Sequence, residues 1–128
     1  MQIAFVYQNT GDYEEAVTYL KLCLENNMEN QDALYELAFC YDVLDKQEES
    51  IQFYEQYIDN EPYSYAAWYN LGNALNKMEM FEKSIDAYDY AILIKDYFAS
   101  AYFNKGNALV HLDRYAEAIT VYKQTFEY

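Results

Sequence analysis

The chain has 128 residues, of which 53% are hydrophobic and 20% aromatic, and its formal net charge is −14. This length fits a single domain. The negative charge argues against nucleic acid and anionic membranes as partners, because both bind basic surfaces. No stretch is apolar for long enough to span a bilayer, so we expect no membrane insertion. The lack of a signal-peptide pattern slightly favours the cytoplasm.

Apolar residues recur at three and four positions along most of the chain, which predicts successive amphipathic helices. Residues 1–9 read as most of a helix. Gly11 suits the left-handed position that follows a helix end, and Asp12 suits the N-cap of the next helix. Pro62 must end any helix that reaches it. The expected helices after residue 9 cover residues 13–26, 31–44, 47–60, 65–78, 81–94, 99–112 and 115–127.

The helices follow a period of 34 residues, since Gly72 aligns with Gly106 (72 + 34) and with Ala38 (72 − 34). Such a period is the mark of a repeat array, in which neighbouring repeats bury a shared core. We expect one domain over residues 1–128. Its repeats would cover residues 1–30 in part, 31–64, 65–98, and 99–128 in part.

The best-formed repeat carries Trp68, Leu71, Gly72 and Leu75, followed by Tyr88. This pattern resembles the tetratricopeptide repeat, whose signature is Trp-x2-Leu-Gly-x2-Tyr followed by Ala-x3-Phe. The resemblance implies an all-α, right-handed superhelical solenoid of antiparallel helix pairs. It also implies a concave groove lined by the first helix of each pair, and a protein or peptide as partner.

An asparagine motif gives the sharpest functional signal: Tyr69-Asn70-x-Gly72-Asn73 recurs as Phe103-Asn104-x-Gly106-Asn107. An amide side chain offers both donors and an acceptor, so a row of amides can pair with the main chain of an extended peptide. This is similar to the asparagine ladder of O-linked N-acetylglucosamine transferases. The alternative is that the asparagines bridge neighbouring helices. By the helix orientation of the family, the expected groove residues are Tyr35, Phe39, Tyr69, Asn70, Asn73, Lys77, Phe103, Asn104 and Asn107.

The sequence shows no catalytic or metal-binding motif, so we expect no enzyme activity, no cofactor and no metal site. His111 is the only histidine and stands near a helix end. Cys23 and Cys40 form no disulfide framework and are expected to be buried free thiols.

The most economical function is a non-catalytic interaction module that holds an extended peptide or a partner helix in its groove. Two alternatives are a structural segment of a longer array and the substrate-recruiting arm of a larger enzyme. The ends of the array would be uncapped, which predicts a homodimer through them. The exposed apolar residues at these ends would be Ile3, Ala4 and Tyr7, and Ile119, Tyr122 and Phe126.

Overall fold

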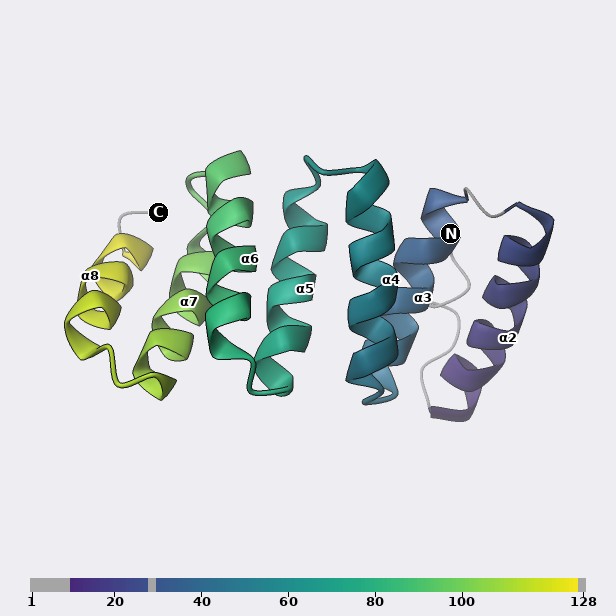
Figure 1. The fold of residues 1–128 in the computed structure, drawn as a ribbon, viewed down its shortest axis with the longest axis horizontal. Coiled ribbons are helices and arrows are strands. Elements are labelled where there is room, and N and C mark those ends of the chain that lie inside the picture. The colour runs from purple at the N-terminus through teal and green to yellow at the C-terminus, as the bar shows by residue number, and fades with distance from the viewer. Residues whose placement is uncertain (1–9, 28–29, 127–128) are drawn as a thin grey trace. The chain divides into compact units, whose positions relative to one another are not determined.

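The computed structural model describes residues 10–27 and 30–126, and within them every regular element is an α-helix. Within each of the two units into which the chain divides, consecutive helices run antiparallel, with connections that alternate between the two ends of the helices (Figure 1). Contacts divide the chain into a first unit, Met1–Pro62, and a second unit, Tyr63–Tyr128. The helices are α2 (Thr10–Asn26), α3 (Gln31–Val43), α4 (Gln47–Asn60), α5 (Tyr65–Lys77), α6 (Phe81–Ile94), α7 (Ala99–His111) and α8 (Tyr115–Thr125).

The all-α class and the antiparallel pairing confirm the expectation from sequence, and most helix ends agree within one or two residues. Helix α2 is the exception, because it begins at Thr10 rather than Tyr13. Gly11 and Asp12 therefore lie in its first turn, and Gly11 does not have the positive φ angle that we expected. In the later helix pairs, the residue that aligns with Gly11 has a positive φ angle, and its N–H donates a hydrogen bond to a carbonyl of the preceding helix. The equivalent preceding residues here lie outside the described part of the chain, as does the helix expected over residues 1–9.

A turn of the same geometry joins the two helices of each of the three described pairs. Asp45, Glu79 and Asp113 stand 34 residues apart and have φ angles of 61°, 59° and 60°. In the first of these turns, the Lys46 N–H donates to the Tyr41 carbonyl at 2.8 Å, and the Asp45 N–H donates to the Asp42 carbonyl at 3.0 Å. This is the Schellman arrangement, which satisfies carbonyls that a helix end leaves unpaired. The 34-residue register thus extends to the backbone angles.

Side-chain caps start two of the first helices. The Asn30 side chain accepts a hydrogen bond from the Ala33 N–H at 3.0 Å, and Ser64 accepts one from the Ala67 N–H at 3.2 Å. Phe98 holds the same position before α7 and provides no such cap. These caps satisfy backbone donors that the first turn of a helix leaves unpaired.

The core of the first unit lies where α3 packs between α2 and α4. Small and apolar side chains fill it, among them Ala16, Leu20, Leu37 and Cys40, which are fully buried. Burial also raises the pKa of the Cys40 thiol to about 11, so this thiol stays protonated and unreactive at neutral pH.

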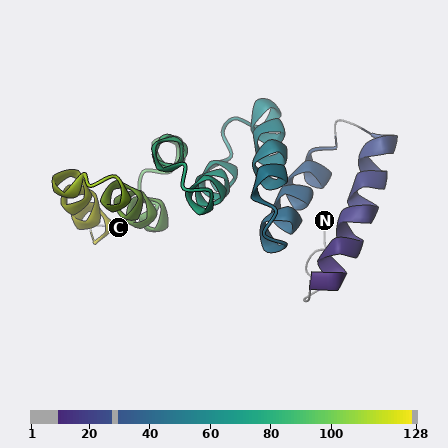
Figure 2. The same ribbon diagram turned by 60° about the horizontal axis from the view of Figure 1, so that its bottom comes forward.

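In the second unit, the helices α5 to α8 follow one another in chain order, as both views show (Figures 1 and 2). Tyr88 of α6 is completely buried, and its ring lies directly against Gly72 of α5. A Cβ atom at Gly72 would lie 2.6 Å from Cε1 of that ring, and one at Gly106 would lie 2.5 Å from Cε1 of Tyr122. Glycine is therefore required at both positions because an aromatic ring occupies the space of a side chain.

Candidate functional site: an amide face on α5 and α7

Asparagines from α5 and α7 join in a hydrogen-bonded group that links two successive repeats. The Asn104 Nδ2 atom donates to the Tyr69 hydroxyl at 3.0 Å and to the Asn73 Oδ1 atom at 3.1 Å. Residues of the two copies of the motif therefore lie side by side. We call this surface the amide face, and it consists of Tyr69, Asn70, Asn73, Phe103, Asn104 and Asn107.

Two of these asparagines also hold the second helix of their own pair. The Tyr88 hydroxyl donates to Asn73 Oδ1 at 2.6 Å, and the Tyr122 hydroxyl donates to Asn107 Oδ1 at 2.5 Å. The alternative reading of the motif, in which asparagines bridge helices, is thus correct for their oxygen atoms. The tyrosines orient the amides and fix which atoms remain for a ligand.

The atoms that remain are mainly donors. Among the described residues, the Nδ2 atoms of Asn73 and Asn107 make no hydrogen bond, and neither does Asn104 Oδ1. Asn73 and Asn107 stand one repeat apart and are held in the same way by a tyrosine. An amide nitrogen held in this manner can donate to a carbonyl oxygen of a peptide main chain.

Aromatic side chains border the amide face. The Tyr69 ring lies 4.8 Å from the Phe98 ring and 5.9 Å from the Tyr88 ring, measured between ring centres. Phe103 is 50% exposed, and its ring lies 5.8 Å from that of Tyr122. The exposed ring offers apolar surface to a ligand beside the amide donors.

Asn70 and Lys77 complete the groove residues expected on α5. Asn70 is partly buried, whereas Lys77 is exposed and is the last residue of the helix. Both take part in further interactions within the structure.

The expected groove residues of the first unit pack differently from those of the second. The Tyr35 ring meets the Tyr54 and Tyr57 rings edge-on, at 5.7 and 5.1 Å between ring centres. Phe39 lies 6.4 Å from Tyr13 and packs against the core. Tyr35 and Phe39 are thus partly buried aromatic packing residues rather than a continuation of the amide row.

An acidic side chain accompanies this aromatic packing. Glu36 is partly buried, and its burial raises the pKa of its carboxyl group above the ordinary value. Among the described residues, the row of amides thus lies in the second unit, and its columns in α3 hold aromatic and acidic side chains.

A lysine surrounded by aromatic rings was not predicted from sequence. The Lys95 ammonium lies 4.5 Å from the ring centre of Tyr65 and 5.2 Å from those of Tyr97 and Phe98. Cation–π attraction of this kind stabilises the end of α6 against the starts of α5 and α7. The sequence does show three aromatic residues near the ends of these helices. It could not show that their rings meet around one lysine, because that depends on how the helices pack.

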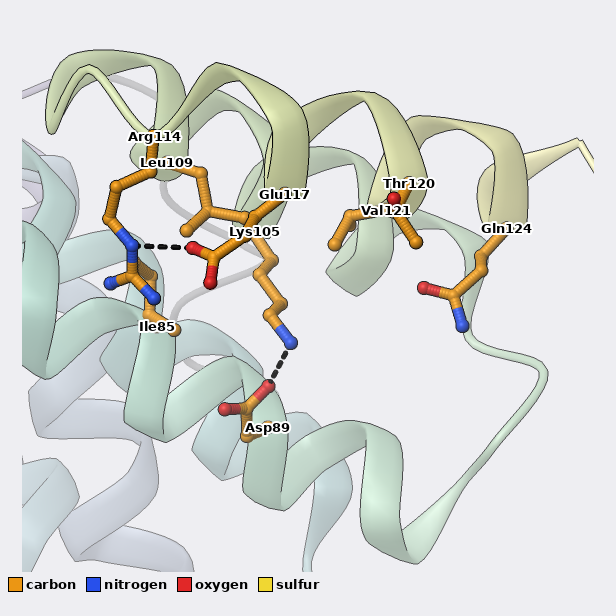
Figure 3. A pocket seen from close by; sticks show the side chains of 9 residues that line it. All are labelled: Ile85, Asp89, Lys105, Leu109, Arg114, Glu117, Thr120, Val121 and Gln124. Atoms are coloured by element: carbon orange, nitrogen blue, oxygen red, sulfur yellow. Dashed lines mark hydrogen bonds and ion pairs between the residues drawn. The ribbon is translucent and has the colours of Figure 1, made fainter.

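A cleft on another side of α7 was also missed. It has a volume of about 350 Å³ and lies between α6 and α8, with Lys105 and Leu109 of α7 forming its floor (Figure 3). The Lys105 ammonium lies 2.6 Å from the Asp89 carboxylate, and the Arg114 guanidinium donates to Glu117 at 2.5 Å. The remaining lining residues are Ile85, Thr120, Val121 and Gln124.

The described residues lack metal-binding and membrane-spanning features. They contain no group of three or more side chains able to hold a metal ion, and none of their helices is long and apolar enough to cross a membrane. The His111 ring stacks on that of Phe81, with 4.4 Å between ring centres, so it serves in packing. Cys23 and Cys40 are free, the first partly and the second fully buried.

Comparison with known proteins gives a consistent fold. Three family models, each described as tetratricopeptide repeat, match residues 10–71, 65–98 and 99–127. A crystal structure of MamA superposes with a TM-score of 0.88 and 23% identity, over 94% of this chain and 75% of that one. No curated protein matches the sequence.

Two further MamA structures agree with the first. One has a TM-score of 0.88 and 26% identity over 91% of this chain and 64% of that one. The other, MamA 41-end from Desulfovibrio magneticus RS-1, has a TM-score of 0.87 and 23% identity over 91% and 66%. This chain therefore spans 64 to 75% of the length of these relatives. Identities at this level show a shared fold.

Proposed function

Because this chain belongs to the tetratricopeptide repeat family, we propose that it is a non-catalytic interaction module whose amide face binds the main chain of an extended peptide. Arrays of this family generally mediate protein–protein interactions. The observation that carries the finer proposal is the pair of tyrosine-held amides at Asn73 and Asn107, each with a free Nδ2 donor.

The geometry supports recognition of peptide carbonyls rather than of side chains. A donor that is already oriented loses little conformational freedom when a ligand binds, which favours affinity. Main-chain carbonyls are present in every peptide, so these donors give affinity without reading a sequence. Selectivity would come from the exposed Phe103 ring and the neighbouring Tyr69.

The test removes the donors and keeps the internal bonds. Asn73→Asp with Asn107→Asp leaves an acceptor for the hydroxyls of Tyr88 and Tyr122 and has no N–H to offer. For a peptide selected from a random displayed library on the wild-type chain, we expect binding to weaken by about 1–3 kcal/mol. Calorimetric titration gives the affinity, and circular dichroism reports the fold.

Two controls distinguish the loss of the amide donors from the effect of added negative charge and from a general loss of stability. Gln52→Glu with Gln56→Glu adds two negative charges at exposed positions of α4, a helix that contributes nothing to the amide face, and should leave affinity unchanged. Tyr88→Phe removes an internal hydrogen bond and should lower stability more than affinity. Unchanged affinity in the double aspartate variant would contradict the proposal.

Self-association is a second, separate prediction, and it concerns the face of α8. Ile119 is 55% exposed, whereas its counterpart Ile85 in α6 is 7% exposed because α7 covers it. Phe126 is 90% exposed, and Tyr122 is partly buried against Asn107. The residues Ile3, Ala4 and Tyr7, expected at the opposite end, lie outside the described part of the chain.

A second copy of the chain that covered this face would bury the apolar surface of Ile119 and Phe126. Light scattering over a concentration series should then show a dimer, and Phe126→Asp should shift the protein toward monomer. If both proteins remain monomeric at high concentration, the predicted homodimer is wrong.

A further inference from the structure

The position of the cleft between α6 and α8 can be compared with the equivalent position two repeats earlier, in the first unit, where two aromatic rings pack together. The register of 68 residues (2 × 34) places Leu109 and Val121 of the cleft in the columns of Tyr41 and Phe53. In the first unit these two rings stack, with 5.6 Å between ring centres and an interplanar angle of 8°. Smaller aliphatic side chains replace both rings in the second unit, and a cavity of about 350 Å³ lies beside them.

The floor of the cleft differs in a second way. Lys105 stands in a column where the other repeats have the buried residues Leu37 and Leu71. A lysine placed in a core column keeps its charge only if the charge is paired or exposed. Here the ammonium reaches Asp89 at 2.6 Å, on the rim of the cleft (Figure 3). The floor of the cleft therefore carries a charged side chain where the equivalent position of the first unit has the fully buried Leu37.

Charge and shape narrow the choice of occupant. The charges of Lys105 and Arg114 are each balanced by a carboxylate within the cleft, so a strongly charged ligand gains little net attraction. The apolar walls are Ile85, Leu109 and Val121. Cationic side chains beside an apolar cleft favour the electron-rich face of an aromatic ring. The first unit shows such a pairing, with the Lys21 ammonium 5.8 Å from the Tyr41 ring centre.

We propose that this cleft binds an aromatic side chain of a partner protein, whose ring occupies the space that the Phe53 ring fills in the first unit. The cavity is large enough for one such side chain. Aromatic residues that enter a pocket of this kind are typical anchors of protein interfaces. The site is separate from the amide face and does not depend on peptide binding there.

The experiment is a nuclear magnetic resonance titration that follows the methyl signals of Ile85, Leu109 and Val121. The probes are N-acetyl-tryptophanamide and N-acetyl-phenylalaninamide, with N-acetyl-leucinamide as the aliphatic control. We expect saturable shifts with both aromatic probes and at least a fivefold weaker response to the leucine probe. Equal responses to all three probes would overturn the proposal. Phenylacetate is titrated as a fourth probe. Saturable shifts with phenylacetate but with neither aromatic amide would overturn the proposal too, because the cleft would then bind a small aromatic acid.

Two variants test the location. Leu109→Tyr with Val121→Phe restores the ring pair of the first unit and should remove saturable binding of both aromatic probes. Lys105→Leu restores the residue type of the other repeats and should weaken aromatic binding several-fold by removing the cation. Undiminished binding in both variants would overturn the proposal. If the ring-pair variant does not fold by circular dichroism, the Lys105→Leu titration decides alone.

Discussion

The two units use the same tyrosine column in different ways. Tyr88 and Tyr122 in the second unit donate their hydroxyl hydrogens to Asn73 and Asn107. Tyr54 in the first unit is completely buried, and its hydroxyl has no hydrogen-bond partner among the residues that the structure describes. The cause lies in the neighbouring column, where Phe39 replaces the asparagine. An aligned residue is therefore an incomplete guide to its interactions, because the acceptor comes from another position in the repeat.

The two units also differ at the repeat position of Gly72, which holds glycine in the second unit and alanine in the first. Gly72 and Gly106 let the tyrosine rings approach within a distance that excludes a Cβ atom. Ala38 holds this position in the first unit and, like Tyr54 of the next helix, is fully buried. We infer that its methyl group keeps the Tyr54 ring farther from α3. The second unit thus combines glycine, asparagine and tyrosine, whereas the first combines alanine, phenylalanine and tyrosine.

The largest expected effect on stability comes from adding a side chain at Gly72, where the Tyr88 ring lies against the helix. Gly72→Ala should destabilise the protein by about 1–3 kcal/mol, because the added methyl group overlaps the Tyr88 ring. The matched change Ala38→Gly should cost about 1 kcal/mol, the usual penalty for glycine inside a helix. Urea denaturation measures both. Gly72→Ala combined with Tyr88→Leu should recover part of the loss, and a harmless Gly72→Ala would contradict the ring contact.

The next prediction is that removing the tyrosine hydroxyl changes the stability of the protein in opposite directions in the two units. Tyr88→Phe should lose about 1 kcal/mol of stability by removing the bond to Asn73. Tyr54→Phe should gain about 1 kcal/mol, because it removes a buried hydroxyl that has no partner. Denaturation of the two variants under identical conditions gives the comparison. Equal losses in both variants would show that Tyr54 has an acceptor.

The smallest expected effect concerns charge. Residues 1–64 contain 14 acidic and 2 basic side chains, a net charge of −12, whereas residues 65–128 contain 8 and 6, a net charge of −2. Glu48→Gln with Glu49→Gln should slow the association of a lysine-rich peptide by about twofold at low salt. Glu82→Gln with Asp86→Asn should slow it less. Stopped-flow measurements at rising salt should reduce both effects, and equal slowing by the two pairs would contradict a preference for the first unit.

The helices and their pairing could be predicted from the sequence because they depend on local apolar spacing and on a period that Gly72, Gly106 and Ala38 repeat. The amide motif also predicts a peptide-binding surface on α5 and α7, and this stays a prediction. It could not show that Asn73 and Asn107 give their oxygen atoms to tyrosines, because that depends on where a second helix places its hydroxyl. The cleft was missed for a related reason: the small size of Leu109 and Val121 matters only beside Lys105, four residues before Leu109 and on the same helix face.

The repeated turn at Asp45, Glu79 and Asp113 has a consequence for how such a protein can change in length. Each turn closes its helix pair with the same backbone hydrogen bonds, and each pair carries its own closure. A duplication of residues 65–98 would therefore insert a complete helix pair with its own closing turn, and the second copy of α6 would meet α7 as the present α6 does. Stability in repeat arrays is approximately a sum over such neighbours. Gene duplication can thus lengthen this protein by whole pairs without a new turn within the pair having to arise.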